Sequence, residues 1–260
     1  MRLITLTTDF GLTDHFVGVM KGVILGISPQ AHIVDITHEC RAYDVSEAAF
    51  TVAQAYRYFP PKTVHVVVVD PGVGTSRRPI LVEAAGQFFV GPDNGVFAFV
   101  LSEQKHKVRA ITSAKYFLQP VSQTFHGRDV FAPVAAHLAN RLPPARLGKP
   151  IQDFLRPRSL KPERTARRGW TGVVLKVDRF GNLITNFLAA DFPRALQGPF
   201  EMAVGLRQVN QMAGNYEQFG PGEVFMIVGS SGYFEISAGQ ASAAKILGVD
   251  AGAPVELTIF

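Results

Sequence analysis

A run of four consecutive valines at positions 66–69 constrains the fold of this chain more than any other segment. Such a run, bounded by turn residues, is typical of a strand that is covered on both faces, as in a parallel sheet flanked by helices. The run ends at Asp70, which Pro71 and Gly72 follow. Because ligands of these sheets bind beyond the carboxyl ends of the strands, Asp70 is a candidate for a functional site.

Asp70 also has an ordinary structural interpretation. In Asp-Pro-Gly, proline presets φ and glycine supplies positive φ, so the residues alone leave a turn and a site equally open. Gly72 and Gly74 suggest a dinucleotide-binding G-x-G-x-x-G loop, but its third glycine would fall on Arg77, whose side chain would obstruct a pyrophosphate. The sequence also lacks a G-x-x-x-x-G-K-[ST] segment. We therefore expect neither a nicotinamide cofactor nor a P-loop.

The apolar patterns around the valine run predict alternating strands and helices. Helices are expected at about 14–27, with Thr13 or Asp14 as the cap, at 44–59, opened by a capping box of Asp44 and Glu47, after Asn94, and at 129–140. Strands are expected at 2–8, 31–36, 66–69, 80–83, 87–90 and 108–111. This order is typical of an α/β sandwich around a mostly parallel sheet.

The last third of the chain has a different character. Short β-rich runs alternate with turns at 170–177, 183–187, 201–209, 223–228, 233–237 and 254–260. This spacing predicts a smaller all-β domain, a barrel or a sandwich. We expect an N-terminal α/β domain over 1–145, a Pro- and Arg-rich linker over 146–168 and the β domain over 169–260.

The charge and apolar content bound the partners. A net charge of +5 suits nucleic acid or an anionic small ligand. Much of the excess lies between residues 141 and 168 without interleaved aromatic residues, which argues against nucleic acid. The apolar runs are too short to span a bilayer, the N-terminus lacks a signal-peptide pattern, and the single cysteine, Cys40, suits a reducing compartment. We expect a cytoplasmic protein without membrane partners, in which Cys40 is buried and inert.

Six motifs follow one another along both predicted domains. They are Thr8-Asp-Phe-Gly with Asp14, Asp70-Pro-Gly-Val-Gly-Thr with Arg77, Gly91-Pro-Asp-Asn-Gly95, Phe125-His-Gly-Arg-Asp-Val-Phe-Ala-Pro133, Asp178-x-Phe-Gly-Asn with Thr185 and Asn186, and Ser230-Ser-Gly-Tyr233. Together they resemble the S-adenosylmethionine hydroxide adenosyltransferases, the hydrolase relatives of the fluorinase and chlorinase. The resemblance implies hydrolysis of S-adenosyl-L-methionine (SAM) to adenosine and L-methionine, with no cofactor and no metal. It also implies a homotrimer whose sites lie between the N-terminal domain of one subunit and the C-terminal domain of its neighbour.

The resemblance assigns a catalytic triad to Asp70, Arg77 and His126. Methionine leaves as a neutral thioether, so the difficulty lies with water, whose pKa is about 15.7. Asp70 would accept a proton or hydrogen bond from water, Arg77 would offset negative charge and His126 would orient the carboxylate or the water. The sequence leaves open which of them takes the proton.

Each of these roles has a structural alternative. Asp70 and Arg77 could form an ion pair that only fixes the loop, and Arg78 could exchange roles with Arg77. By itself, His126 is typical of a residue at a helix entry with Asp129 as the cap.

The resemblance also implies a set of substrate contacts. Asp9 would bind the ribose 2′- and 3′-hydroxyls, Asn182 and Ser230 would contact the methionine or adenine portions, and the pocket would include Asp14, Asn94 and Phe180. Turn chemistry explains several of these equally well, above all Asp14, Asn94 and Ser230. Ile184 and Ser231 stand where the halogenases often have an aromatic residue or arginine, so their contacts stay unassigned.

Two other functions compete with hydrolysis. A halogenase would bring a halide to the same carbon, but the Asp70 carboxylate would repel that anion. A non-catalytic sensor of adenosyl ligands would need Asp9 and Asn182 but has no use for the whole triad.

Overall fold

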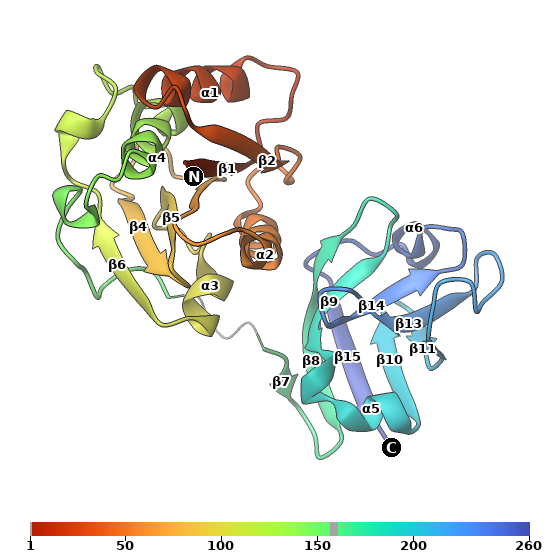
Figure 1. Ribbon diagram of the computed structural model, residues 1–260. Helices are drawn as coiled ribbons and strands as arrows, with labels where there is room; N and C mark the ends of the chain where they lie inside the picture. Colours follow the sequence, from red (N-terminus) through yellow and green to blue (C-terminus); the bar gives the residue numbers. More distant parts are fainter. Residues whose placement is uncertain (1, 157–160) are drawn as a thin grey trace. The chain divides into compact units, whose positions relative to one another are not determined.

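The computed structural model describes residues 2–156 and 161–260, which form two compact units (Figure 1). The N-terminal unit extends to residue 157 and the C-terminal unit follows it. Each unit is built on its own sheet, so the chain has the expected mixed α/β fold. The predicted linker over 146–168 includes residues 157–160, which lie outside the described residues. Before them, Leu147 and Phe154 are buried in the N-terminal unit.

A six-stranded sheet forms the centre of the N-terminal unit. Its order is β2-β1-β3-β5-β4-β6, in which β2, β1, β3 and β5 are parallel neighbours and β4 is antiparallel to β5 and β6. The strands are β1 (Leu3–Thr8), β2 (His32–Thr37), β3 (Val64–Val68), β4 (Pro79–Ala84), β5 (Gln87–Pro92) and β6 (His106–Ala110). The parallel strands place the ends of β1 and β3 at the same edge of the sheet.

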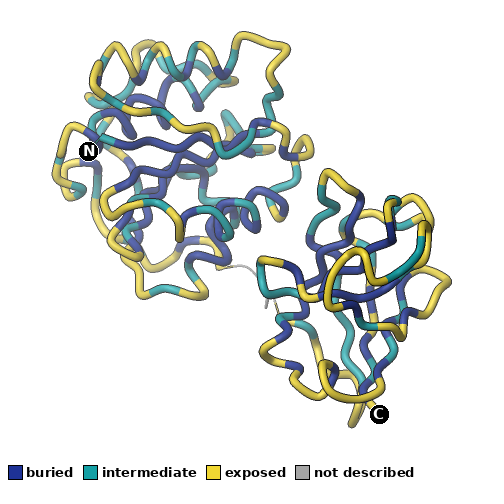
Figure 2. Tube along the Cα trace, turned by 45° about the vertical axis from the view of Figure 1, so that its right-hand side comes forward, coloured by how far each residue is buried: buried dark blue, intermediate teal, exposed yellow. Residues whose placement is uncertain are grey.

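Helices cover both faces of this sheet (Figure 1). α1 (Phe16–Ile27) and α4 (Ala132–Ala139) share a core with one face, and α2 (Val45–Ala55) and α3 (Ala98–Glu103) share a core with the other. Figure 2 shows the buried residues gathered in the centre of the unit, where β1 and β3 are buried along their whole length, whereas the edge strand β2 has no buried residue. Among the described residues, no helix combines the length and the apolar character needed to cross a bilayer.

The valine run explains why β3 lies in the middle. Val64, Val66 and Val68 point into the core below α1 and α4, while Val67 and Val69 point into the core below α2 and α3. All five are at most 2% exposed, and burying each side chain contributes about 1.5 kcal/mol or more. The predicted two-sided strand is confirmed, and Asp70 follows it directly.

One of the two predicted N-terminal caps is present and the other is not, because a cap depends on local geometry as well as on residue type. The Asp44 side chain accepts a hydrogen bond from the backbone N–H of Glu47 at 2.9 Å, as the capping box requires. By contrast, α1 begins at Phe16 after an N-cap residue, His15, that makes no side-chain cap bond. The prediction that Thr13 or Asp14 caps this helix is therefore wrong.

The C-terminal unit contains a nine-stranded sheet in the order β11-β10-β15-β8-β9-β14-β13-β12, with β7 beside β8. Its strands are β7 (Glu163–Arg164), β8 (Gly169–Val177), β9 (Leu183–Leu188), β10 (Phe200–Val204), β11 (Arg207–Val209), β12 (Met212–Ala213), β13 (Val224–Val228), β14 (Tyr233–Ala238) and β15 (Pro254–Ile259). The two ends of this path, β11 and β12, are separated by two residues in the chain, so the sheet must curl back on itself. Two short helices, α5 (Pro193–Gln197) and α6 (Ala243–Leu247), correct the expectation of an all-β domain.

A buried polar chain crosses the sheet of the N-terminal unit at His65. Its Nδ1 lies 2.7 Å from the Thr5 hydroxyl and its Nε2 lies 3.1 Å from the Gln87 amide oxygen. The Gln87 amide nitrogen donates to backbone carbonyls, including that of Phe59 at 2.6 Å. Burial lowers the pKa of His65 to about 4, because the charged imidazolium would lose its hydration there.

This histidine predicts a pH-dependent stability. Between pH 6.5 and about 4, the unfolded chain protonates His65 while the folded chain keeps it neutral, so the free energy of unfolding falls as the pH drops. The difference between the pKa of His65 in the unfolded and in the folded chain corresponds to a loss of about 3 kcal/mol in the free energy of unfolding. Urea denaturation across this pH range should show that a His65→Gln variant has a shallower pH dependence than the parent. Identical slopes in the two proteins would contradict the assignment.

Candidate active site

Asp70 and Arg77 form a two-pronged ion pair in the loop after β3. Arg77 Nε donates to Asp70 Oδ1 at 3.0 Å, and Arg77 Nη2 donates to the other carboxylate oxygen. Their side chains are only 5% and 7% exposed, respectively. Removing one partner would leave a buried charge without its counterion, which typically costs about 3–5 kcal/mol.

The third member of the predicted triad, His126, contacts the same guanidinium. Arg77 Nη2 lies 3.1 Å from His126 Nδ1. A guanidinium has no acceptor, so Nδ1 must accept this hydrogen bond and the neutral ring carries its proton on Nε2. Burial and the positive charge of Arg77 lower the pKa of His126, which favours this neutral form. The structure therefore brings all three residues together.

Burial dominates the electrostatics of the carboxylate. It raises the pKa of Asp70, and the positive charge of Arg77 opposes but does not cancel this effect. The Arg77 guanidinium also lies 5.4 Å from the centre of the buried Phe131 ring, which excludes water from that side. Among the described residues, no three His, Cys, Asp or Glu side chains are arranged to hold a metal ion.

Arg78 is held elsewhere. Its Nη1 donates to both carboxylate oxygens of Asp153 at 3.0 Å, and its Nη2 donates to Asp93 at 2.9 Å. Arg78 thus joins the loop to the turn that follows β5 and to the segment that follows α4, and it is Arg77 that reaches Asp70.

Gly74 brings the Asp70 loop against the segment that carries His126. Its φ is +77°, and a Cβ atom at this position would lie 2.2 Å from the backbone oxygen of Gln123. Only glycine tolerates both the conformation and the contact. Since Gln123 precedes His126 by three residues, this close approach places the imidazole beside Arg77.

His126 stands at the start of a π-helical turn, Gly127–Phe131, that leads into α4. Its predicted position at a helix entry is confirmed, but the role of Asp129 as the cap is not. Asp129 is fully buried and accepts a hydrogen bond from the Ser122 backbone N–H at 2.8 Å. It therefore holds the loop before His126 rather than the free N–H groups of the helix.

Asp9 lies at the end of β1, close in space to the His126 segment. Its Oδ2 accepts a hydrogen bond from the backbone N–H of Tyr43 at 2.9 Å. The next residue, Phe10, packs edge-on against Phe125, with 5.9 Å between ring centres. Asp14 is exposed and makes no hydrogen bond within the described part of the chain.

A polar chain behind Asp9 was not predicted. The Thr8 hydroxyl lies 2.8 Å from His38 Nδ1, His38 Nε2 lies 3.0 Å from Asp35, and Lys21 binds Asp35 at 2.5 Å. This chain fixes the last residue of β1 and therefore the position from which Asp9 projects. Its only sequence signal is the cluster of polar residues at the ends of two apolar strands.

Asn94 fastens a loop to the end of β3. Its side-chain nitrogen donates to the Val69 carbonyl at 2.9 Å, and its side-chain oxygen accepts from the Val96 N–H at 3.1 Å. Within this chain Asn94 therefore makes the contacts of a turn residue. One of these contacts is with Val69, the residue that precedes Asp70.

In the C-terminal unit, Asp178 organises the turn between β8 and β9. Its Oδ1 accepts from the backbone N–H groups of Phe180 and Asn182 at 2.9 Å, and its Oδ2 accepts from the Asn182 amide at 2.8 Å. Asn182 is buried, whereas Phe180 is 77% exposed at the tip of the turn. Asp178 was not among the candidates, although an Asp two residues before Phe-Gly-Asn is a recognisable turn signal.

Ser230 is exposed on the turn between β13 and β14. The neighbouring Ser231 hydroxyl is buried and has no hydrogen-bond partner among the described residues. Further along, Glu235 is buried beside the Tyr216 hydroxyl at 3.3 Å, and this burial raises the pKa of Glu235. These candidates belong to the C-terminal unit, whereas Asp70, Arg77 and His126 belong to the N-terminal unit.

The close contact at Gly74 yields a prediction with a matched control. Gly74→Ala should lower the free energy of unfolding by about 2 kcal/mol or more, because the new methyl group meets a backbone oxygen at positive φ. Gly72→Ala, whose Cβ would meet no atom closer than 3.5 Å, should change it far less. Urea denaturation of both variants tests this, and equal effects would contradict it.

Comparison with known proteins places the chain in a family. Residues 4–148 match the model of the SAM hydroxide adenosyltransferase N-terminal domain, and residues 172–256 match that of the C-terminal domain. A solved structure described as an uncharacterized conserved protein from Thermotoga maritima superposes with a TM-score of 0.91. It is 37% identical, and the match covers 98% of this chain and 99% of that one.

Named relatives agree with the family match. The (R)-S-adenosyl-L-methionine hydrolase of Thermus thermophilus is 38% identical over 272 residues, covering 99% of this chain and all of the relative. A fluorinase from an Actinoplanes species is more distant, at 29% identity over 220 residues and 74% of each chain. The chain is therefore a member of the SAM hydroxide adenosyltransferase family.

Proposed function

We propose that this protein hydrolyses SAM to adenosine and L-methionine by attack of water on the ribose C5′. The observation that carries the proposal is the buried contact of Asp70, Arg77 and His126 at the end of β3. Full-length similarity to proteins named (R)-S-adenosyl-L-methionine hydrolase supports the substrate and the bond that is cleaved.

The hydrogen-bond pattern favours Asp70 as the group that accepts the proton of water. Arg77 cannot accept a proton, and His126 uses Nδ1 to accept from Arg77 while Nε2 already carries hydrogen. Asp70 keeps free lone pairs besides those that Arg77 occupies. Its raised pKa makes it a stronger base than an aspartate in water.

The remaining steps balance around this transfer. The water oxygen forms a bond to C5′, and the C5′–S bond breaks with its electron pair moving to sulfur. Methionine therefore leaves as a neutral thioether without a general acid, and the proton of water passes to Asp70. His126 Nε2–H donates to the water oxygen and sets the line of attack.

One nitrogen of the Arg77 guanidinium is left without a partner in the described structure. This atom, Nη1, is buried and makes no hydrogen bond with any residue that the structure describes. The other nitrogens of the guanidinium hold Asp70 and His126. One positive group thus fixes both the base and the orienting imidazole, and its charge lies close to the oxygen that becomes negative.

The same charges argue against a halide as the nucleophile. A chloride or fluoride ion beside Asp70 would meet a buried carboxylate, and Coulomb repulsion grows as water is excluded. The lower identity to the fluorinase agrees with this preference.

Substrate contacts complete the proposal. Asp9 has one carboxylate oxygen that makes no hydrogen bond in the described structure, which suits the ribose hydroxyls. We propose Asn182, Phe180 and Ser230 as contacts of the methionine or adenine portions, with Asn94 and Asp14 near the pocket. A homotrimer and a cytoplasmic location complete the proposal, and the mass in solution tests the first of these.

Hydrolysis of SAM by the purified protein is the prediction that tests the proposed function directly. Purified protein with SAM and no added metal should release adenosine and methionine in equal amounts. In ¹⁸O water the label should enter the 5′-hydroxyl of adenosine, because the C5′–S bond is the one that breaks. Stoichiometric binding without adenosine release would favour a sensor instead, and halogenated nucleoside in the presence of chloride or fluoride would favour a halogenase.

Substitutions separate the roles of the polar groups. Asp70→Asn and His126→Ala should lower kcat by about a hundredfold or more while SAM still binds, and Asp9→Ala should weaken binding. Because Asp70 must be ionised, kcat/KM should fall at low pH with a midpoint above the ordinary aspartate value of 3.8. A parental rate in Asp70→Asn would show that this carboxylate is not the base.

A further inference from the structure

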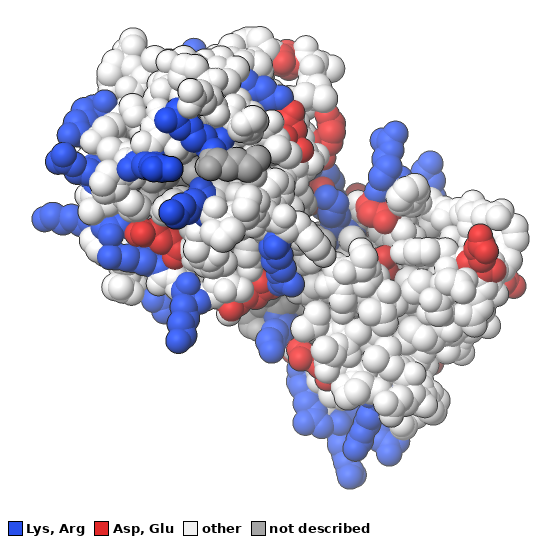
Figure 3. Space-filling model, viewed as in Figure 1, with Lys and Arg blue, Asp and Glu red and all other residues white. Residues whose placement is uncertain are grey.

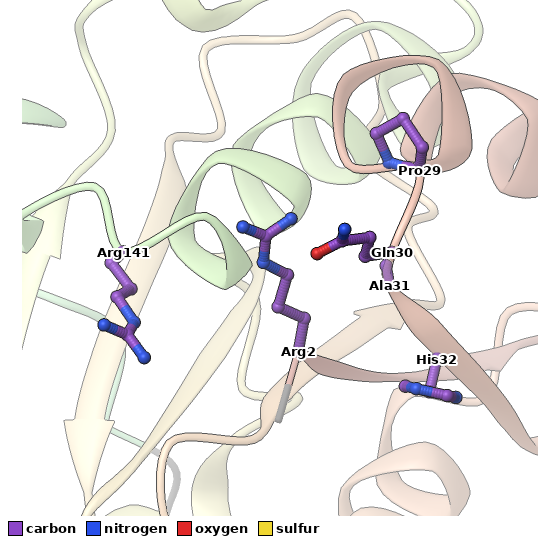
Figure 4. A pocket seen from close by; sticks show the side chains of 6 residues that line it. All are labelled: Arg2, Pro29, Gln30, Ala31, His32 and Arg141. Carbon is purple, nitrogen blue, oxygen red and sulfur yellow. The ribbon is translucent and has the colours of Figure 1, made fainter.

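A pocket lies in the N-terminal unit where β1 and β2 begin (Figure 4). Because β3 is parallel to β1, this is the edge of the sheet opposite to the end of β3 that precedes Asp70. The pocket has a volume of about 800 Å³, and we call it the arginine pocket. Its lining residues come from the start of β1, the turn between α1 and β2, the first residue of β2 and the end of α4; they are Arg2, Pro29, Gln30, Ala31, His32 and Arg141.

The polar groups of the arginine pocket are two guanidiniums, an amide and an imidazole. The described lining includes neither Asp nor Glu. Figure 4 shows the Arg2 side chain rising between Gln30 and Arg141. Within residues 2–156 and 161–260, neither Arg2 nor Arg141 forms an ion pair, whereas Arg77 and Arg78 both bind carboxylates.

The two arginines are not needed to satisfy the helix ends nearby. The Ser28 N–H donates to the Ile24 carbonyl at 2.8 Å, and the Asn140 amide donates to the Ile27 carbonyl at 2.9 Å. The Ser28 hydroxyl also donates to the Asn140 side chain at 2.8 Å, so the ends of α1 and α4 are joined without help from a guanidinium. The pocket walls are therefore fixed by other groups.

Arg141 occupies a position that backbone geometry reserves for glycine. It follows α4 with a φ of +66°, a conformation that costs a residue with a Cβ about 1 kcal/mol. An exposed arginine at this position is thus not explained by the termination of the helix. Binding of a ligand by the Arg141 side chain is a better explanation for an arginine at this position.

The charge of the pocket is also unrelated to the proposed reaction. SAM carries a positive sulfonium, so the net charge of +5 does not serve to attract it. Figure 3 shows Lys and Arg side chains gathered on the face of the N-terminal unit near the start of β1. A cationic surface around a cationic pocket suits an anion.

We propose that the arginine pocket binds a small phosphate-bearing anion. Guanidiniums match phosphate oxygens with paired hydrogen bonds, and Arg2 and Arg141 offer two of them without competing carboxylates. Gln30 and His32 supply further N–H donors for the remaining oxygens. The site is separate from the triad, so the proposal stands whether or not the protein hydrolyses SAM.

Calorimetric titration with inorganic pyrophosphate, in buffer without metal or phosphate, tests the proposal. The parent protein should show saturable binding. Arg2→Ala and Arg141→Ala should each weaken it by about tenfold or more, since a hydrogen-bonded charge pair is lost. The matched control is Arg207→Ala, which removes an exposed arginine from β11 of the other unit and should leave binding unchanged.

A second variant guards against loss of structure. Arg141→Gly relieves the positive φ and should keep or raise the thermal stability while it lowers pyrophosphate affinity as much as Arg141→Ala does. The absence of saturable binding, or an equal loss in Arg207→Ala, would overturn the proposal. Tight binding of a short DNA duplex that the pocket substitutions abolish, without pyrophosphate binding, would assign the surface to nucleic acid and also overturn it.

Discussion

The candidate site depends on one guanidinium. Arg77 donates to both oxygens of Asp70 and to Nδ1 of His126, and it does so where almost no water reaches. Its contacts explain why the loop after β3 needs Gly74, why the segment before α4 passes so close, and why the imidazole is neutral. Without this cation the Asp70 carboxylate would be a buried charge with no counterion, and the folded conformation of the loop would be destabilised.

The sequence predicted those parts of the structure that depend on local patterns. Alternating burial of the valines set the position of β3, and the capping box placed the start of α2. The choice between Arg77 and Arg78 was not accessible, because the two residues are adjacent and only the turn of the loop decides which one faces Asp70. For the same reason the sequence position of Asp129 predicts a cap, whereas its partners are the Ser122 N–H in the preceding loop and the Arg128 guanidinium.

Contacts between strands were the least predictable from sequence. Thr8, His38 and Asp35 meet because β1 and β2 are parallel neighbours, and nothing in the local sequence indicates that pairing. Asp178 is hard to predict for a simpler reason: it accepts hydrogen bonds from backbone groups of its own turn, and an aspartate with this role looks like ordinary turn chemistry.

The burial of Asp70 has a kinetic consequence. In the proposed reaction each cycle ends with a proton on this carboxyl group, whose side chain is 5% exposed and cannot pass the proton to bulk water while products fill the pocket. The base is regenerated after adenosine or methionine departs and solvent returns. Product release and recovery of the active ionisation state would then be a single event, and a slow exit of adenosine would hold the enzyme in its protonated resting form.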